Sequence, residues 1–530
     1  MISDSPALVE EERVTTKYRL GRWGHDVVVV CVTGACLAMI VSVIWSAIPG
    51  TWGNSRVSLP GNVLPWLVVS TVLAGALVLA IRRLMRRGWQ PRISLLGGAI
   101  FLAAFGAKLF VAIRVDSVPV SDFRVMLEAG QGIAAGDWAF NQLEYFQLWG
   151  YQTGFAAYQG LVLKVTGPST LGLVTMNALL MAGTNLMVFL FAHRMTGNRW
   201  VATGAAVAYL AYPGPFVLAP VLTNQHIGTC LLYVGLFLAL KSIQDVTGWY
   251  RVWWAGGAGL ALALSHLMRP LAVVAMLAVV VAVGLAWLVG RVGWKGGLVV
   301  ALATVTVFYG VTRGADLVAR ASGFNPTGLS NNFPEWKLYS GLSRETGGRL
   351  MQIPDGLVER QGNTTTVDHA AAQALVRAQL DDVVRHLPSF LARKTAAMWA
   401  AEESRGFTFR AQLDLDEPYR TEAMDKLDQV ALAERSIFLV VVALAGAAGL
   451  VGWRRRPVEV APLLIATFMA GYFVAHLVYQ VQPRFRYEWM PAAFAYASLS
   501  LQQLAVARRG RPLANEDDGT DSGTGEQPAE

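Results

Sequence analysis

Apolar stretches of roughly 20 residues recur along almost the whole chain, and no other feature of the sequence constrains the fold as strongly. A helix that crosses a bilayer needs about this length, because every backbone polar group must find its partner inside the segment. The sequence therefore predicts an all-α polytopic membrane protein with about 12 transmembrane helices, one partial or re-entrant helix and external juxtamembrane helices. The expected spans are 26–48, 64–83, 92–113, 170–192, 200–220, 225–243, 253–268, 270–289, 297–314, 435–452, 458–478 and 487–507.

Composition favours the same class of protein. Only 15% of the 530 residues are charged, whereas soluble domains approach about a quarter. The formal net charge of +8 could suit a nucleic-acid partner, but the cations occur in short runs between apolar segments, as membrane topology requires. We therefore expect no nucleic-acid partner. Cys31, Cys36 and Cys230 all fall in apolar runs, which argues against a disulfide framework or a thiolate metal site.

The distribution of charge predicts the orientation of the chain. The first apolar run, 26–48, exceeds a signal-peptide core and follows three glutamates at 10–12, so we expect it to remain as an anchor. The cations between residues 13 and 22 then place the N-terminus in the cytoplasm.

The segment 152–166 is short for a span and carries Lys164. If it crossed the bilayer, every later loop would change sides and the positive-inside rule would fail at five loops. We therefore interpret it as the partial or re-entrant helix. The cytoplasmic side then collects the cationic segments at 82–87, 194–199, 241–251, 291–295, 454–456 and 508–511.

This orientation puts two large loops on the external face and predicts that function resides there. The last stretch of the chain is acidic and has no apolar residue that could anchor a core, so it is expected to be disordered. The expected parts are a cytoplasmic segment (1–25), a membrane core (26–314) with a first external, catalytic loop (114–169), a second external loop that covers the cavity and acceptor (315–434), C-terminal membrane helices (435–507) and a cytoplasmic tail (508–530).

Asp122 is the principal candidate for catalysis in the first external loop. It follows Ser121 where an amphipathic helix is expected to begin. One interpretation is a first-turn carboxylate that satisfies free amides and the helix dipole, which contributes around 1 kcal/mol. The other is a general base that takes a proton from an acceptor hydroxyl, which commonly contributes ~10² to 10⁴ in rate. Spacing alone leaves both open, whereas Asp137, which follows a glycine, is interpreted as a turn residue.

Cations also occur at the external ends of two spans. Arg484 and Arg486 precede the last span, where guanidinium groups can bind phosphate or can simply snorkel to the interface. Arg269 interrupts an apolar stretch before Pro270, and a charge inside a span costs ~3 kcal/mol unless it reaches an interface or an anion. We therefore expect Arg269 to face the external cavity.

Few other chemical motifs are present. His226, beside Asn224 at the same face, has no partner at metal-ligand spacing and is interpreted as an interfacial polar residue. The sequence has no P-loop, GxGxxG, HExxH, CxxC pair or GxSxG, so nucleotide hydrolysis and nicotinamide chemistry have no support. Sugar nucleotides are absent outside the cytoplasm, so a glycan-building enzyme there needs a lipid-linked donor.

From about residue 90 to 500 the chain resembles the GT-C superfamily of polytopic glycosyltransferases, in particular bacterial relatives of the protein O-mannosyltransferases and the lipid A aminoarabinose transferase. The resemblance rests on the order of short motifs. These are Asp122 followed by Ala129, Ile133 and Gly136; Tyr145, Tyr151, Gln152 and Gly154; Arg269 and Pro270; Pro334, Trp336, Gly341, Leu342 and Gly347; and Gln482, Arg486, Tyr487 and Pro491.

This resemblance implies transfer of a sugar from a polyprenyl-phosphate donor to an acceptor hydroxyl on the extracytoplasmic face, with inversion and with Asp122 as the base. No cofactor is implied. Many relatives carry an acidic pair in the first loop, and the single carboxylate here is a poor site for a divalent metal. The donor phosphate would be bound by Arg486, Arg484, Arg269 and Tyr487. The substrate cavity would be lined by Arg124, Glu144, Tyr145, Tyr151, Gln152, Asn224, His226 and Trp336.

Two rival functions stay open. A transporter or flippase of a polyprenyl-linked glycan also needs phosphate-binding arginines. It would in addition require ionisable residues inside several spans, whereas most of those in this chain lie at the ends of spans. A non-catalytic scaffold is the third possibility. The bias toward Ala, Val, Gly and Arg indicates a high-GC bacterium, so we expect plasma-membrane location and a role in envelope glycan or glycoprotein assembly. The sugar is undetermined, and so is the acceptor, which could be a glycan, a lipoglycan or a protein.

Overall fold

The structure is a computed structural model that describes residues 6–46, 63–115, 117–413, 419–454 and 458–506. The predicted acidic tail at 508–530 lies outside the described residues. The predicted N-terminal segment is largely helical, because the first helix already begins at Pro6.

Eight helices within the described part of the chain are long and apolar enough to cross a membrane, and each coincides with a predicted span. The chain is therefore a multi-pass helical membrane protein. These helices are α1 (Pro6–Ser46), α2 (Leu64–Arg86), α3 (Ile93–Arg114), α7 (Thr170–Thr196), α10 (Gln225–Gln244), α13 (Trp294–Ala321), α18 (Tyr419–Arg454) and α19 (Val460–Val478).

The other four predicted spans are not among these eight helices. One of them, 200–220, was predicted as a single helix and is broken at Tyr212 into α8 (Arg199–Ala211) and α9 (Pro213–Leu218). Pro213 and Pro215 cause the break, because proline has no amide hydrogen and disfavours a helical residue before it. The remaining three are helical, and the total of about 12 membrane crossings stays a prediction. They are α11 (Trp249–Met268), α12 (Ala272–Leu288) and α20 (Met490–Val506).

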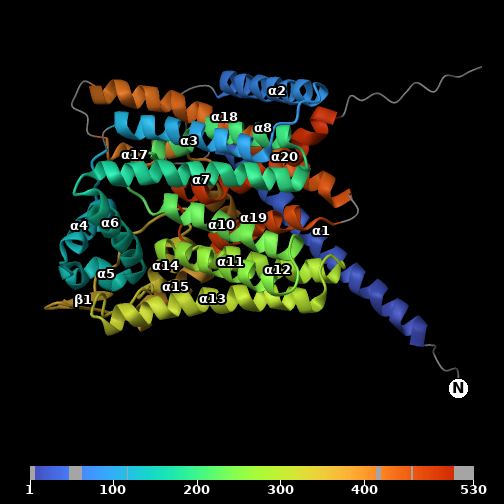
Figure 1. Ribbon diagram of the computed structural model, residues 1–530. Coiled ribbons are helices and arrows are strands. Elements are labelled where there is room, and N and C mark those ends of the chain that lie inside the picture. Colours follow the sequence, from blue (N-terminus) through green and yellow to red (C-terminus); the bar gives the residue numbers. More distant parts are fainter. Residues whose placement is uncertain (1–5, 47–62, 116, 414–418, 455–457, 507–530) are drawn as a thin grey trace, which may run out of the picture.

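The long helices run side by side, with α7 between α3 and α10, and α11 between α10 and α13 (Figure 1). A continuous apolar core fills the spaces between them. Phe189, Leu236, Val279, Phe438 and Phe468 are among its fully buried side chains.

The first loop folds into short helices at one end of this bundle (Figure 1). Its helix α6 has 14 residues and packs along α4. That length rises only about 21 Å, short of the ~30 Å hydrocarbon core. A Cβ at Gly130 would lie 2.9 Å from Cβ of Gln159, and one at Gly160 would lie 2.7 Å from Cγ2 of Ile133, so the close contact requires glycine. The elements are α4 (Asp122–Ala135), η1 (Ala139–Gln142), α5 (Glu144–Leu148), η2 (Gly150–Gln152) and α6 (Thr153–Thr166).

The second loop packs against the first. Backbone bridges join Ser117 to Leu413 and Trp149 to Asn331. The two strands form an antiparallel hairpin in which Val358 pairs with Val367. The elements of this loop are α14 (Pro334–Leu342), β1 (Val358–Gln361), β2 (Thr364–Val367), α15 (His369–Arg385), α16 (Leu387–Trp399), η3 (Glu403–Arg405) and α17 (Phe407–Arg410). Between α19 and α20 lies the short helix η4 (Pro483–Glu488), which belongs to the same end of the molecule.

Candidate active site

Polar side chains from both loops, from the end of α11 and from η4 meet where these segments adjoin. The charge of Asp122 acts on Tyr145, Tyr151, Lys337 and Arg484, so these residues share one electrostatic environment. We refer to the group as the polar cluster. Its members are Asp122, Tyr145, Tyr151, Arg269, Lys337, Arg484 and Glu488.

Asp122 is the first residue of α4 and its side chain is exposed. The residue before it, Ser121, has φ 51° and ψ −133°, a backbone conformation that L-residues rarely adopt. Ser121 makes no side-chain capping hydrogen bond to α4. Asp122 thus occupies the first turn, as the helix-dipole interpretation requires, and its carboxylate also belongs to the polar cluster.

Arg269 ends α11 and is held on three sides. Its Nε lies 2.7 Å from Oε1 of Glu488, its Nη1 donates to Oδ1 of Asn224 at 3.4 Å, and its guanidinium stacks 4.6 Å above the ring of Phe485. Asn224 in turn donates to Oε1 of Gln152 at 3.2 Å. Gln152 and Asn224, both predicted cavity residues, therefore orient Arg269 beside the polar cluster.

Among the described residues, Arg484 makes no ion pair with a carboxylate. Its guanidinium lies 5.1 Å from the ring centre of Phe123, the residue after Asp122, and 5.7 Å from that of Phe485. Its Nε is buried and has no hydrogen-bond partner among the described residues. Burial and the neighbouring Arg269 lower the pKa of Arg484 to about 10, against the opposing effect of Asp122. Such a guanidinium is suited to an anionic ligand.

Lys337 joins the cluster from the second loop and was not among the residues predicted from sequence. Its ammonium donates to Oε1 of Gln480 at 2.9 Å and lies 4.4 Å from the ring of Trp336. Burial lowers the pKa of Lys337 to about 7, with Asp122 acting in the opposite direction. Its position directly after Trp336 was the only signal in the sequence, because nothing there shows that α14 packs against the end of α19 and Gln480.

Aromatic side chains form one wall of the cluster. The rings of Trp149 and Trp336 lie 5.6 Å apart, and Tyr145 lies 5.1 Å from Trp149. Neither indole N–H has a hydrogen-bond acceptor among the residues that the structure describes. Burial raises the pKa of Tyr151 to about 12 and that of Tyr145 well above its usual range, so both phenols stay protonated near neutral pH.

Arg486, the arginine that the motif resemblance favoured for the donor phosphate, lies elsewhere. It is 1% exposed, is paired with Glu434 and has its Nε 3.8 Å from Oε1 of Glu403. Nearby, Arg435 pairs with Glu402 in the same buried network. The geometry thus assigns Arg486 a structural ion pair and favours Arg484 for contact with an anion.

Three further predicted site residues lie outside the polar cluster. The hydroxyl of Tyr487 is 3.0 Å from Nδ1 of His226, and both side chains are buried. Nε2 of His226 lies 3.0 Å from the carbonyl of Leu218, so the imidazole is satisfied by the fold. Arg124 points away: its side chain is 71% exposed and pairs with Glu128 at 2.7 Å.

The remaining acids of the first loop have ordinary positions. Glu144 begins α5 and is half-buried. Asp137 accepts a hydrogen bond from the amide of Ala139 at 2.9 Å, which is the turn interaction predicted for it. Within the described residues, no group of three or more His, Cys, Asp or Glu side chains could hold a metal ion.

An apolar pocket of about 360 Å³ adjoins the polar cluster. Two of its lining residues are sequence neighbours of site residues: Thr153 follows Gln152, and Met268 precedes Arg269. Its lining includes Thr153, Gly154, Leu161, Leu267, Met268 and Phe324.

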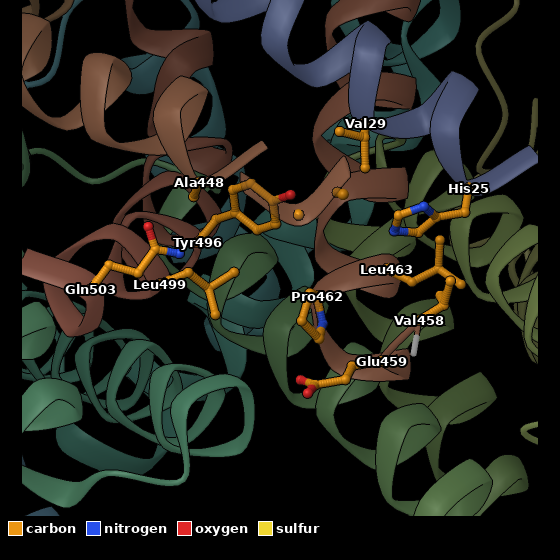
Figure 2. A pocket seen from close by; sticks show the side chains of 12 residues that line it. His25, Val29, Ala448, Val458, Glu459, Pro462, Leu463, Tyr496, Leu499 and Gln503 are labelled. Carbon is orange, nitrogen blue, oxygen red and sulfur yellow. The ribbon is translucent and has the colours of Figure 1, made fainter. Parts of the chain in front are cut away.

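A second pocket, of about 120 Å³, is shown in Figure 2 and lies among α1, α18, α19 and α20. Glu459, which lines this pocket, precedes the first residue of α19, whereas Gln480 of the site follows the last residue. The pocket and the site therefore lie at opposite ends of α19. None of the predicted site residues lines this pocket. Its polar members are His25, Glu459, Tyr496 and Gln503.

No protein-family model and no curated protein matches the sequence. Among solved structures, the chain is similar to crystal structures of ArnT from Cupriavidus metallidurans, bound to undecaprenyl phosphate (TM-score 0.33) and in the apo state (TM-score 0.31). Identity is 15% in both cases, and the alignments cover 78% and 77% of each chain, respectively. A likeness this distant assigns neither a family nor an activity to this chain.

Proposed function

We propose that the protein is a membrane glycosyltransferase that moves a sugar from a polyprenyl-phosphate donor to an acceptor hydroxyl on the extracytoplasmic face of the plasma membrane. The observation that carries the proposal is the position of Arg484. The side chain is half-buried, its buried Nε has no hydrogen-bond partner among the described residues, and its guanidinium shares the polar cluster with Arg269 and Asp122. A carboxylate and an anion-binding group held together in this way suit transfer from a phosphate leaving group.

The donor fits the two halves of the site. Its phosphate lies against Arg484 and Arg269, and the first isoprene units occupy the apolar pocket that starts at Thr153 and Met268. Apolar surfaces of this kind exclude water from the charged groups and so strengthen their interaction with phosphate.

Asp122 acts as the general base. Its carboxylate takes the proton of the acceptor hydroxyl while that oxygen forms a bond to the anomeric carbon. The bond between this carbon and the phosphate oxygen breaks, and its electron pair stays on the phosphate, which leaves as a polyprenyl monophosphate. Attack from the face opposite the phosphate inverts the anomeric centre. Arg484 and Arg269 stabilise the charge that grows on the leaving oxygen.

The sugar lies against the aromatic wall. Trp149 and Trp336 offer apolar ring faces and two indole N–H groups without acceptors among the described residues, and a sugar hydroxyl is a suitable acceptor. The second loop, which supplies Trp336, covers the cavity and selects the acceptor. The acceptor is a glycan, a lipoglycan or a protein.

The test is sugar transfer by the purified protein in lipid. A panel of radiolabelled polyprenyl-phosphate sugars is offered with cell-envelope extract as acceptor, and wild type is compared with Asp122→Asn. Transfer from one donor that is lost in the variant supports the proposal and names the sugar. Donor binding without transfer or hydrolysis, accompanied by movement of the donor between leaflets of liposomes, would instead establish a flippase.

A further inference from the structure

The protonation state of Lys337 decides the net charge of the polar cluster. Arg269 and Arg484 are cations, and Asp122 and Glu488 are carboxylates, so these four groups cancel. A sugar phosphodiester brings one further negative charge into this partly buried site. An uncompensated charge is expensive in such surroundings, which makes a third cation valuable.

Lys337 is placed to supply that cation. The charges that act on its ammonium are those of Asp122 on α4, Arg269 at the end of α11 and Arg484 in η4. The two arginines disfavour its protonated form and Asp122 favours it. Burial has the largest effect and also disfavours the ammonium, so its charged form is poorly stabilised in the absence of an anion.

The immediate partner of Lys337 is neutral. Oε1 of Gln480 accepts its hydrogen bond at 2.9 Å, and the backbone amide of Gln480 donates to the carbonyl of Lys337 at 3.2 Å. The ring of Trp149 lies 6.0 Å from the ammonium on another side. Gln480 thus fixes the position of the lysine without neutralising it, so its charge stays available to a ligand.

On this basis, and resting on the function proposed above, we propose that Lys337 is a third ligand of the donor phosphate, and that donor binding protonates it. The proton comes from solvent when the phosphodiester enters and returns to solvent when the product phosphate leaves. The consequence is a donor affinity that falls as pH rises through the range in which Lys337 loses its proton. Burial places the pKa of Lys337 at about 7 in the empty site, and a bound phosphate raises it.

The experiment is titration calorimetry of the full-length protein in nanodiscs with farnesyl methyl phosphodiester. This probe is a monoanion that does not itself titrate near neutrality. Heats measured at pH 8 in two buffers of different ionisation enthalpy yield the number of protons taken up per ligand bound. For wild type we expect between about half and one proton.

Three variants separate charge from protonation. Lys337→Met removes the cation, so binding is expected to weaken about 10- to 100-fold and uptake to vanish. Lys337→Arg keeps a permanent cation, so binding persists without uptake. Gln480→Glu keeps the lysine protonated in the empty site, so uptake is lost and binding weakens. Lys426→Met, at a side chain that is 74% exposed, is the matched control and should behave as wild type.

Thermal unfolding of each variant establishes that it is folded. Unchanged proton uptake in folded Lys337→Met or Lys337→Arg protein would overturn the inference while leaving the proposed function intact. Failure of wild type to bind the phosphodiester at all would overturn both.

Discussion

Nε of Arg269 lies 2.7 Å from Oε1 of Glu488, and this ion pair joins the end of α11 to η4. Glu488 also accepts hydrogen bonds from the hydroxyl of Tyr472 at 3.1 Å and from Nε2 of Gln225 at 3.4 Å. The carboxylate is 2% exposed and the guanidinium 11% exposed. The pair therefore fixes one of the two arginines of the polar cluster, and in the proposed function the charge on Glu488 affects how strongly Arg269 binds the donor phosphate.

Glu488→Gln should lower the melting temperature of the ligand-free protein, because Arg269 loses its buried counter-charge at a cost of about 1–3 kcal/mol. The freed guanidinium should bind the donor phosphate more strongly. Melting is measured with and without farnesyl methyl phosphodiester, and we expect a larger ligand-induced rise in the variant. An equal rise in both proteins would argue against a contact between Arg269 and the phosphate.

Asp122→Asn keeps the shape of the side chain but cannot accept the proton, so transfer should fall by ~10² to 10⁴. Donor binding should be retained, because the substitution removes a negative charge near Arg484. Asp137→Asn is the matched control, since asparagine can still accept the hydrogen bond from Ala139. Full transfer by a correctly inserted Asp122→Asn protein would rule out the assigned base.

Arg484→Gln should weaken donor binding about 10- to 100-fold, because a charge-assisted contact to phosphate is lost. Arg124→Gln is the comparison, and its exposed ion pair with Glu128 predicts an effect within about twofold. Both are measured as the donor Kd and as KM in the transfer assay. The reverse pattern would support the predicted place of Arg124 in the substrate cavity.

Arg486→Met should destabilise the protein by about 3–5 kcal/mol, because Glu434 and Glu403 lose their buried partner. The double variant Arg486→Met, Glu434→Met should recover part of that loss, since an apolar pair can replace a buried ion pair. Chemical denaturation and donor binding are measured together. If the single variant were fully stable and only donor binding were lost, Arg486 would be a phosphate ligand after all.

The buried ammonium of Lys394 should make the free energy of unfolding depend on pH. Its ammonium, buried in α16, donates to the carbonyls of Gly341 and Tyr479, and burial lowers the pKa of Lys394 to about 7, from 10.5. Between pH 7 and pH 10.5, Lys394 is protonated in the unfolded chain and largely deprotonated in the folded protein. The free energy of unfolding should therefore rise from pH 7 toward pH 10.5 by at most about 1.4 kcal/mol per pH unit. Lys337 adds a slope of the same sign.

Denaturation series at pH 7 to 9 measure this slope in wild type, Lys394→Met and the exposed control Lys426→Met. We expect Lys394→Met to show a smaller slope than wild type, because a group that binds fewer protons in the folded protein than in the unfolded chain has been removed. Identical slopes in all three proteins would show that the ammonium of Lys394 is solvated in the folded state.

Local sequence accounted for much of the helical architecture. The eight long apolar helices coincide with predicted spans because length and hydropathy are local properties, and α6 is as short as 152–166 implied. The predicted helix 200–220 was wrong as a single element, although Pro213 and Pro215 were visible in the sequence. The apolar composition of this segment predicted one continuous helix, but proline has no amide hydrogen with which to continue it.

The sequence by itself determined a multi-pass helical membrane protein, with cations and acids concentrated in the segments between spans. Only the tertiary structure decided which of these charges meet. Arg484 and Arg486 are separated by one residue, yet the charge of Asp122 acts on Arg484, whereas Arg486 is buried in an ion pair with Glu434. Lys337 enters the cluster because α14 packs beside Gln480. Such pairings depend on contacts between residues far apart in the chain, and spacing along a sequence carries no record of them.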